Sequence, residues 1–373
     1  MNILLLTDQM YPSQHSSVEG LFHTEAARLG RVWRVYFERH LTVPQRDGEV
    51  IRLPLSCRRH GVVAALQQVI DFHEIDVVIV RNWFSLLRQC LRLRQDIPSL
   101  RLGMWESFPH TYRRLHEART EGRALWRKAI EVKLKTLWED RLLAQVDFHL
   151  FISAGFQQQI RPQVQRPWLA LPMGVDLLDL PRQPAPPRNG PLRLVYIGTI
   201  DALRRVDLLA AALHARKEDF QLDFYTSSDN ASLASLRQID DARIRILPAL
   251  PRRALFERLQ DYDVGIALIP DDALYRVASP TKTFEYAALG LAVLLNPLPE
   301  HVAVLDSDDA IYCSFDSAGL ASGLDRLFAT PRPSLQAMGR RARAAVLEKR
   351  SYPALATELA AFLASIRPPS MPA

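Results

Sequence analysis

The sequence predicts an α/β protein with two Rossmann-like, doubly wound domains. Short apolar runs alternate with stretches of helical periodicity, which favours parallel sheets covered by helices. The length of 373 residues is enough for two domains of ordinary size. Residues 177–191, LLDLPRQPAPPRNGP, are dense in proline and predict a semi-rigid linker. We therefore expect domains at residues 1–176 and 192–350, followed by a C-terminal helix and tail at 351–373.

Composition narrows the class of protein. Apolar residues make up 48% of the chain and charged residues 24%, which is a globular composition. No apolar run approaches ~18 residues, so no transmembrane helix is expected. The N-terminus lacks the basic start and the cleavage site of a signal peptide. The three cysteines are scattered without metal-ligand spacing, which predicts reduced thiols, no metal site and a cytoplasmic location.

The net charge of +6 is distributed unevenly. Lys and Arg number 24 against 17 Asp and Glu over residues 1–175, but 23 against 24 in the remainder. This basic excess suggests that the N-terminal domain faces an anionic surface or acceptor. No nucleic-acid partner is expected.

The first domain opens with a strand at residues 2–7, a loop, and a helix at residues 20–29. This order is typical of a doubly wound domain. No G-x-G-x-x-G motif follows the strand, so no dinucleotide cofactor is expected there. Further strands are predicted at residues 32–37, 50–53, 77–80, 100–104 and 148–152, with helices at 62–72 and 84–93.

Residues 111–146 form a long, basic, helix-prone stretch with an apolar side that includes Trp126 and Trp138. A basic amphipathic helix with tryptophans can lie on an anionic membrane, which would make the protein peripheral at the inner membrane face. The alternative is an ordinary surface helix that packs on the sheet and leaves its charges solvated.

The second domain repeats the alternation of strands and helices. Helices are predicted at residues 207–213, 252–260 and 281–289, and an apolar helix at 352–366 ends the chain before two prolines. Strands are predicted at residues 192–197, 220–225, 244–247, 264–269 and 293–295.

The most informative stretch is residues 279–300, SPTKTFEYAALGLAVLLNPLPE. It reads as a Ser-Pro pair, a helix, a stop at Gly290 and a buried strand. Lys282 and Glu285 are the only ionisable residues of the helix, and their spacing of three places them on one face. A cation in the first turn adds to the anion-binding backbone N–H groups, and a carboxylate one turn later suits ribose hydroxyls. The pair suggests a nucleotide diphosphate site, with a solvated Lys–Glu ion pair as the alternative.

Several segments resemble the retaining GT-B glycosyltransferases of the family-four-like, or group 1, type. The most specific is the stretch at residues 279–301, which is similar to the nucleotide-binding segment of that family. The others are LVYIGTIDALRRVDLL at 194–209, LFERLQDYDVGIALIP at 255–270, PMGVD at 172–176 and DFHLFISAGFQQQI at 147–160.

The resemblance implies a GT-B fold, in which two Rossmann-like domains face a cleft and the second domain binds a nucleotide sugar. In that family, Lys282 would bind the donor pyrophosphate and also assist catalysis, and Glu285 would bind the ribose. Either Arg204 or Arg205 matches a basic residue on the pyrophosphate, and the motif does not choose between them. The remaining implied donor contacts are Gly198, Thr199, Pro280 and Thr283.

The sequence departs from the family pattern at two points. Many members carry a second Glu eight positions before the ribose Glu, where this chain has Val277. Tyr275 or Arg276 could take over contacts to the sugar or phosphate. The loop after the first strand lacks the common Gly-Gly pair and keeps only Gly20.

On the acceptor side, the strand at residues 100–104 leads into a loop that carries Glu106 and His110. The family often has a His or an acidic residue there, so Glu106 is a candidate base or hydroxyl anchor and His110 the second candidate. The alternative is that these loop residues only order the backbone. Gly20, His15 and His23 are weaker candidates for contact with the acceptor.

The implied reaction transfers a hexosyl or related group from a nucleotide-diphosphate sugar to a glycan or lipid-linked acceptor, with retention. The nucleotide sugar is a substrate, so no cofactor is expected. Lys282 and its basic neighbours would stabilise the leaving diphosphate without a metal ion. Two other functions stay open: a non-catalytic GT-B partner protein that binds nucleotide or membrane, and a nucleotide-sugar epimerase.

Overall fold

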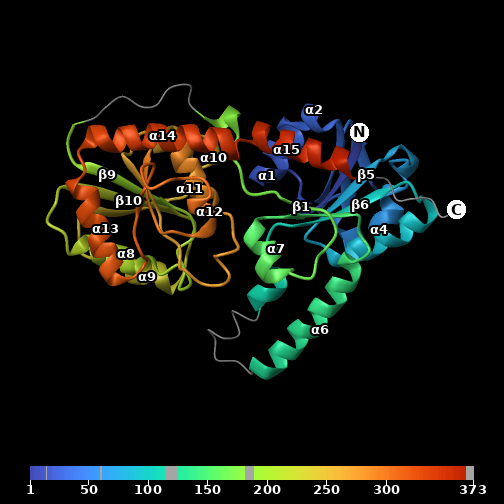
Figure 1. Ribbon diagram of the computed structural model, residues 1–373, viewed down its shortest axis with the longest axis horizontal. Coiled ribbons are helices and arrows are strands. Elements are labelled where there is room, and N and C mark those ends of the chain that lie inside the picture. Colours follow the sequence, from blue (N-terminus) through green and yellow to red (C-terminus); the bar gives the residue numbers. More distant parts are fainter. Residues whose placement is uncertain (14, 59–60, 115–124, 181–188, 367–373) are drawn as a thin grey trace. The chain divides into compact units, whose positions relative to one another are not determined.

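A computed structural model describes residues 1–13, 15–58, 61–114, 125–180 and 189–366 (Figure 1). The chain divides into two compact α/β units. Unit 1 comprises Met1–Met173 together with Tyr352–Ala373, and unit 2 comprises Gly174–Ser351.

Unit 1 contains an eight-stranded sheet with the order β3-β4-β2-β1-β5-β6-β7-β8. All neighbouring strands are parallel except the edge pair β3–β4. The strands are β1 (Asn2–Met10), β2 (Arg31–Glu38), β3 (Gln45–Asp47), β4 (Val50–Pro54), β5 (Val77–Arg81), β6 (Arg101–Glu106), β7 (Phe148–Phe151) and β8 (Trp168–Ala170). The helices are α1 (Ser16–Glu19), α2 (Ala26–Leu29), α3 (Val62–Leu66), α4 (Phe84–Asp96), α6 (Leu125–Leu143), α7 (Ala154–Ile160) and α15 (Tyr352–Ser365).

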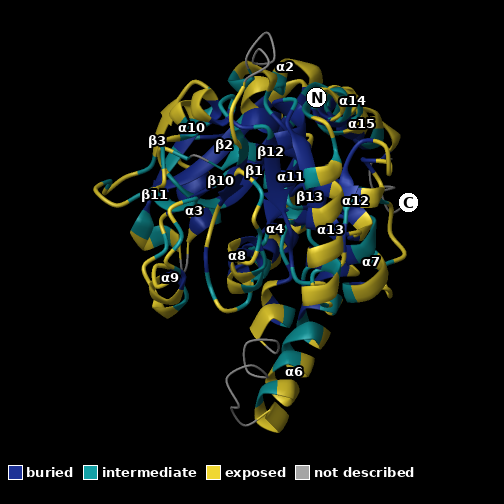
Figure 2. Cartoon of the chain, turned by 90° about the vertical axis from the view of Figure 1, so that its left-hand side faces the viewer, coloured by how far each residue is buried: buried dark blue, intermediate teal, exposed yellow. Residues whose placement is uncertain are grey.

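Both faces of the unit 1 sheet are buried, because alternate residues of β1 enter different cores. Leu4 and Leu6 belong to one apolar cluster, and Ile3 and Leu5 belong to the other. Figure 2 shows the central strands as buried and the outer helix faces as exposed. This two-sided burial explains why the strands read as continuous apolar runs.

Unit 2 contains a six-stranded parallel sheet with the order β11-β10-β9-β12-β13-β14. Its central strand β9 (Leu192–Ile197) also alternates between two cores, with Leu194 and Tyr196 in one and Val195 and Ile197 in the other. The other strands are β10 (Phe220–Thr226), β11 (Ile244–Pro248), β12 (Val264–Ala267), β13 (Ala292–Leu295) and β14 (Ile311–Tyr312). The helices are α8 (Val206–His214), α9 (Ala231–Leu236), α10 (Arg252–Leu259), α11 (Thr281–Ala288), α12 (Pro299–Val302), α13 (Ser317–Ala329) and α14 (Arg332–Arg350).

The predicted strands are all present, and the short strands β3, β8 and β14 are additional. The helix predicted at residues 20–29 is broken into a π-helical turn at Gly20–Thr24 and α2, and α1 precedes it. The predicted helix at 62–72 is shorter, because α3 ends at Leu66. Part of the long basic helix predicted at 111–146, residues 115–124, lies outside the described residues.

The C-terminal segment, predicted as a separate helix and tail, belongs to unit 1. Tyr352, Leu355, Leu359 and Leu363 of α15 are buried in the same cluster as Ile3 of β1. The predicted linker also differs. Its first residues form a short 3-10 helix, Leu177–Asp179, which is part of unit 2, while residues 181–188 lie outside the described part.

Candidate functional site

The strongest candidate site in unit 2 lies where β9 ends and α11 begins, and we call it the β9–α11 site. It contains Tyr196, Gly198, Arg204, Lys282 and Glu285. Sites of doubly wound domains form at the carboxyl ends of parallel strands, and β9 is the central strand at this edge.

Lys282 is the central cation of this site. Its Nζ lies 3.7 Å from the centre of the Tyr196 ring. Burial, and then the positive charge of Arg204, lower the pKa of Lys282 to about 7. Two cations this close favour an anionic ligand, because a ligand with negative charge would relieve their repulsion.

Arg204, rather than Arg205, is the basic neighbour of Lys282. Arg204 donates to the Asp201 carboxylate, and its backbone N–H donates to the same residue at 2.9 Å. Arg205 has a left-handed backbone with φ of 48°, a half-exposed side chain and an ion pair to Asp207 at 3.7 Å. Of the two arginines that the sequence left open, Arg204 is therefore the one whose charge acts on Lys282.

The turn after β9 is open. Gly198 has φ of +120°, a conformation that favours glycine, and a Cβ added there would meet no atom within 4 Å. Thr199 is exposed beside it, and its backbone carbonyl accepts a hydrogen bond from the Tyr196 hydroxyl at 3.2 Å. A ligand can therefore approach the backbone of this turn closely.

Pro280 is the N-cap residue of α11, and its side chain caps nothing. Thr283, which was expected to contact the donor, has a different role. Its side chain is fully buried, and its hydroxyl lies 2.9 Å from Nε2 of His301. Burial lowers the pKa of His301 to about 4, so the ring is neutral. Nδ1 of His301 donates to the Asn296 carbonyl at 2.7 Å, which leaves Nε2 to accept from Thr283.

Glu285 is nearly buried and is already paired. Its Oε1 accepts a hydrogen bond from Nη1 of Arg252 at 2.6 Å, and Nε of Arg252 donates to Asp179 at 2.6 Å. Nη2 of Arg252 is buried and has no hydrogen-bond partner among the described residues. Arg252 thus fixes the carboxylate that was predicted to bind ribose. The sequence analysis did not select Arg252, although it begins the predicted helix at residues 252–260, which follows the predicted strand at 244–247; this strand–helix junction is the signal that could have identified it.

The position of the missing carboxylate is an apolar one, because the Val277 side chain is fully buried. Of the two residues considered as substitutes, Arg276 is exposed and donates to Asp271 at 2.6 Å. Tyr275 is half-buried, and burial raises its pKa, with Arg204 and Asp201 close enough to influence it. Tyr275 is therefore the better-placed substitute.

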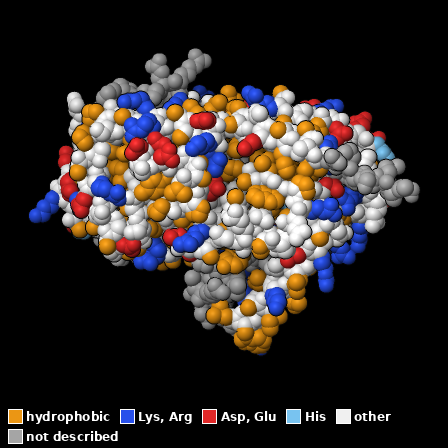
Figure 3. All heavy atoms as spheres, in the orientation of Figure 1, with side chains coloured by type: hydrophobic (Ala, Val, Ile, Leu, Met, Phe, Trp, Pro, Cys, Tyr) orange, Lys and Arg blue, Asp and Glu red, His pale blue; other side chains and the backbone are white. Residues whose placement is uncertain are grey.

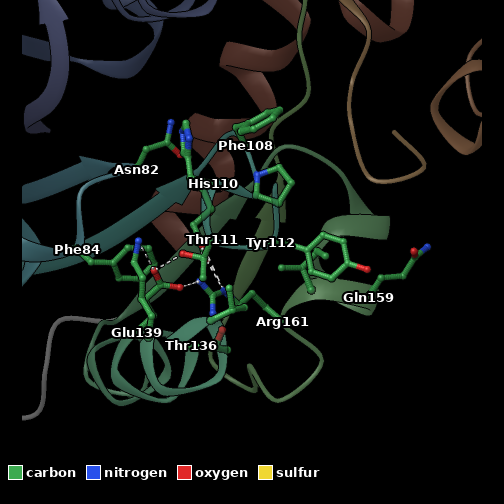
Figure 4. A pocket seen from close by; sticks show the side chains of 15 residues that line it. Asn82, Phe84, Phe108, His110, Thr111, Tyr112, Thr136, Glu139, Gln159 and Arg161 are labelled. Carbon is green, nitrogen blue, oxygen red and sulfur yellow. Dashed lines mark hydrogen bonds and ion pairs between the residues drawn. The ribbon is translucent and has the colours of Figure 1, made fainter. Parts of the chain in front are cut away.

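Unit 1 has its own cavity of about 280 Å³ at the carboxyl end of β6 (Figure 4). Asn82, Phe108, His110, Lys135 and Gln159 line it. Burial, and then Arg113, lower the pKa of His110, which favours the neutral ring. His110 therefore has the right form for a hydrogen bond to a hydroxyl group.

Glu106 lines the same cavity, but its expected role as a base is not supported by its contacts. Arg161 donates to both Glu106 carboxylate oxygens at 2.8–3.2 Å and also to Glu139 at 2.6 Å. Thr111 donates to Glu139 at 2.7 Å (Figure 4). Because Glu106, Glu139 and Arg161 are all buried, this cluster anchors α6 and α7 to the sheet.

The three weaker acceptor candidates also have structural partners. Nε2 of His15 lies 2.7 Å from Nη2 of Arg81, and Nδ1 lies 3.0 Å from Oγ of Ser17. Burial, and then Arg81, lower the pKa of His15 to about 4, so the neutral ring accepts from Arg81. His23 is exposed and lies 3.4 Å from Glu19. A Cβ added to Gly20 would lie 2.1 Å from the Tyr352 ring, so Gly20 makes room for α15.

The described residues also bear on the predictions about metal ions and membrane-spanning helices. No group of three or more His, Cys, Asp or Glu side chains in this part of the chain could hold a metal ion. No described helix is both long and apolar enough to span a bilayer.

Comparisons with known proteins agree with this architecture. Residues 204–361 match a protein-family model described as "Glycosyl transferase-like". No curated protein matches the chain. The solved structures with a similar fold include a sucrose-phosphate synthase from Thermosynechococcus elongatus, with a TM-score of 0.72, 14% sequence identity and coverage of 98% of both chains.

Two further structures show the same fold at low identity. A UDP-forming α,α-trehalose-phosphate synthase from Burkholderia xenovorans has a TM-score of 0.65 and 13% identity, and covers 98% of this chain and 99% of its own. A structure described as trehalose-6-phosphate from E. coli, bound with UDP-2-fluoro glucose, has a TM-score of 0.66 and 11% identity, and covers 99% of this chain and 100% of its own. The predicted GT-B fold and the resemblance to group 1 glycosyltransferases are confirmed.

Proposed function

We propose that this chain, a glycosyltransferase of the GT-B type, transfers a hexosyl group from a nucleotide-diphosphate sugar with retention of configuration. The observation that carries the proposal is the pair of cations at the β9–α11 site, where Arg204 is close enough to lower the pKa of Lys282. Breaking the anomeric C–O bond leaves negative charge on the departing diphosphate. Preorganised cations stabilise that charge, and here the chain supplies them from its own residues, without a metal ion.

The donor is proposed to lie along α11. Its pyrophosphate contacts Lys282, Arg204 and the Gly198 turn, and its ribose hydroxyls donate to Glu285. Tyr275 faces the sugar in place of the missing carboxylate. We take UDP-glucose as the first donor to test, because one structure of the same fold holds UDP-2-fluoro glucose and another is named as UDP-forming.

The proposed acceptor is a glycan or lipid-linked intermediate at the inner membrane face. It is proposed to enter the unit 1 cavity beside His110, whose neutral ring can accept a hydrogen bond from the reacting hydroxyl. The basic excess of the N-terminal half supports an acceptor that carries negative charge, such as a phosphate or diphosphate linker.

A second candidate is a non-catalytic GT-B partner protein, which the buried Val277 in place of a sugar-binding carboxylate favours. This protein would bind nucleotide without turnover. One measurement distinguishes the two candidate functions, namely the release of UDP from UDP-glucose in the presence of acceptor. Only the glycosyltransferase would release UDP.

Thermal shift with UDP-, GDP- and ADP-sugars tests the donor site. A saturating donor at ~100 Kd stabilises the protein by about 2.7 kcal/mol. Lys282→Ala is expected to abolish the shift, whereas the control Lys217→Ala, at an exposed lysine of the same unit, keeps it. The proposal fails if no nucleotide sugar raises the melting temperature of the wild-type protein. It also fails if Lys282→Ala responds like the control.

A further inference from the structure

Helix α6 carries an apolar stripe on its outer face that no described element covers. Trp126, Ile130, Leu134 and Leu137 are 63%, 52%, 63% and 50% exposed. Of the eleven exposed large hydrophobic side chains in the described part of the chain, five lie in the thirteen residues from Leu125 to Leu137. Exposed apolar residues are normally scattered singly, so this concentration indicates a contact surface.

The four side chains form one continuous surface. At 100° per residue they fall within an arc of about 80°. The buried residues of α6 in the described part of the chain are Glu139, Leu142 and Leu143, at its C-terminal end. The rest of the helix extends away from the sheet, with its outer face exposed along its length (Figure 2). Residues 125–137 of the stretch thus form a surface helix with an exposed apolar face.

Exposed cations border the stripe. Arg127 and Lys133 lie on its two sides, Arg141 lies within it, and all three are exposed. No described carboxylate forms an ion pair with any of these three residues. Figure 3 shows hydrophobic side chains gathered on this helix.

The acidic residues of α6 do not cancel this charge. Glu139 and Asp140 are paired with Arg161 at 2.6 and 3.0 Å. Glu131 is paired with Lys128 at 2.8 Å. The outer face of α6 therefore combines an apolar stripe with unpaired positive charge.

We propose that this outer face of α6 is a membrane-insertion surface that binds the anionic headgroup layer of a lipid bilayer. The helix lies parallel to the bilayer, with Trp126, Ile130, Leu134 and Leu137 among the acyl chains and the three cations at the anionic headgroups. Tryptophan prefers this interfacial depth. The described residues form no membrane-spanning helix, so the contact is peripheral.

Charge complementarity favours a bilayer over a second copy of the chain. In a symmetric dimer the same surface meets itself, so Arg127, Lys133 and Arg141 would face the cations of the other copy. Like charges brought together in this way oppose association. An anionic bilayer is complementary to both parts of the surface, because its acyl chains suit the apolar stripe and its headgroups suit the cations.

This inference rests on the proposed function, because a lipid-linked acceptor explains why a glycosyltransferase would need to lie on a bilayer. Co-sedimentation with vesicles of phosphatidylcholine, alone or mixed with phosphatidylglycerol, tests it. We expect binding to the mixed vesicles, weakened by high salt. Leu134→Glu is expected to lower the partition coefficient roughly tenfold or more. Lys133→Glu is expected to lower it roughly fivefold, and only with phosphatidylglycerol present.

Two controls match these variants. Val43→Glu places the same charge on an exposed apolar residue elsewhere in unit 1, and Arg39→Glu reverses an exposed charge there. Both should bind vesicles like the wild type. Equal partitioning of Leu134→Glu and Val43→Glu would overturn the inference, as would failure of the wild type to bind mixed vesicles. A concentration-dependent dimer that Leu134→Glu abolishes would assign the stripe to a second copy instead.

The vesicle test is separable from the test of the donor site. Thermal shift with a nucleotide sugar needs no lipid, and Leu134→Glu lies outside the β9–α11 site. A protein that binds nucleotide sugar but not vesicles refutes the membrane surface alone. A protein that binds vesicles through α6 but no nucleotide sugar refutes the proposed function alone.

Discussion

The ammonium nitrogen of Lys282 lies 3.7 Å from the centre of the Tyr196 ring. The aromatic ring attracts this cation, but burial and Arg204 oppose its charge and bring its pKa to about 7. Lys282 is thus about half protonated at neutral pH, and binding of a pyrophosphate draws a proton onto it.

The donor affinity should therefore depend on pH. Below about pH 7 the lysine is already in the charged form that binding requires, so the donor affinity should not change with pH. Above pH 7 the affinity should fall roughly tenfold per pH unit, until the pKa of the bound state is reached. Isothermal titration with UDP in two buffers of different ionisation enthalpy measures both the affinity and the proton uptake.

Lys282→Arg is the matched variant for the pH dependence, because a guanidinium stays charged across this range. It should bind UDP with little change between about pH 6 and pH 9. An equal slope in the variant and the wild type would mean that another group titrates.

Arg252 is expected to act as a positioning residue for Glu285. Arg252→Met leaves the nearly buried carboxylate without its charged partner and should cost about 1–2 kcal/mol of stability, a modest value because the arginine side chain is about one third exposed. The neighbouring Arg253 is 92% exposed and pairs only with Glu257 in this part of the chain, so Arg253→Met should cost less than about 0.5 kcal/mol.

The same pair of variants reports on ribose recognition. Because Glu285 is proposed to accept from the ribose hydroxyls, a wild-type site should prefer UDP-glucose over its 2′-deoxyribose analogue. Arg252→Met should reduce this preference, raising KM for the ribonucleotide donor roughly tenfold with less effect on kcat. An unchanged preference in Arg252→Met would remove Arg252 from donor recognition.

Arg161 should be essential for the fold of unit 1. Arg161→Met leaves the buried carboxylates of Glu106 and Glu139 uncompensated and should cost about 3–5 kcal/mol. Arg166→Met, at an exposed arginine five residues later, should be close to neutral. Chemical denaturation of both variants measures the difference.

If Glu106 is structural, Glu106→Gln should lower stability but leave the shape of the pH–rate profile unchanged. If the variant instead lost one limb of the pH–rate profile while its melting temperature stayed unchanged, Glu106 would be the catalytic base.

Gly20 should tolerate no side chain while Tyr352 is present. Gly20→Ala places a Cβ 2.1 Å from the Tyr352 ring, and such overpacking should cost about 1–3 kcal/mol. Tyr352→Ala opens space at the same point. The double variant should therefore be more stable than the sum of the two single effects predicts. Additive effects in thermal denaturation would show that the two residues do not share this contact.

The sequence was sufficient for the strands but not for the partners of the charged residues. Apolar runs such as residues 192–197 predict β9 directly, because both faces of the sheet are buried. The spacing of Lys282 and Glu285 placed both on α11. Spacing cannot show that Arg252, which is 33 positions away, donates a hydrogen bond to Glu285. Nor can it show that Arg161, which is 55 positions away, donates to Glu106. These pairings depend on the three-dimensional order of the strands.

The same limit applies to Thr283 and Gly20. Both fitted a functional pattern along the chain, and both instead pack against segments that follow much later, His301 and Tyr352. The basic stretch at 111–146 left two interpretations open, and the exposed fractions of Trp126 and Leu134, which support the proposed membrane surface, could not be predicted from the sequence.

The division of unit 1 into two chain segments has a consequence for synthesis of the protein. Residues 1–173 leave the ribosome first, but the apolar cluster around Ile3 and Phe22 is completed by Leu355 and Leu359, which are made only after unit 2. Unit 2 has all its residues once Ser351 has emerged. The unit that is translated second is therefore complete first. Until α15 has been made, the apolar cluster on one face of the unit 1 sheet stays incomplete. During this interval the nascent chain is most susceptible to aggregation or to binding by a chaperone.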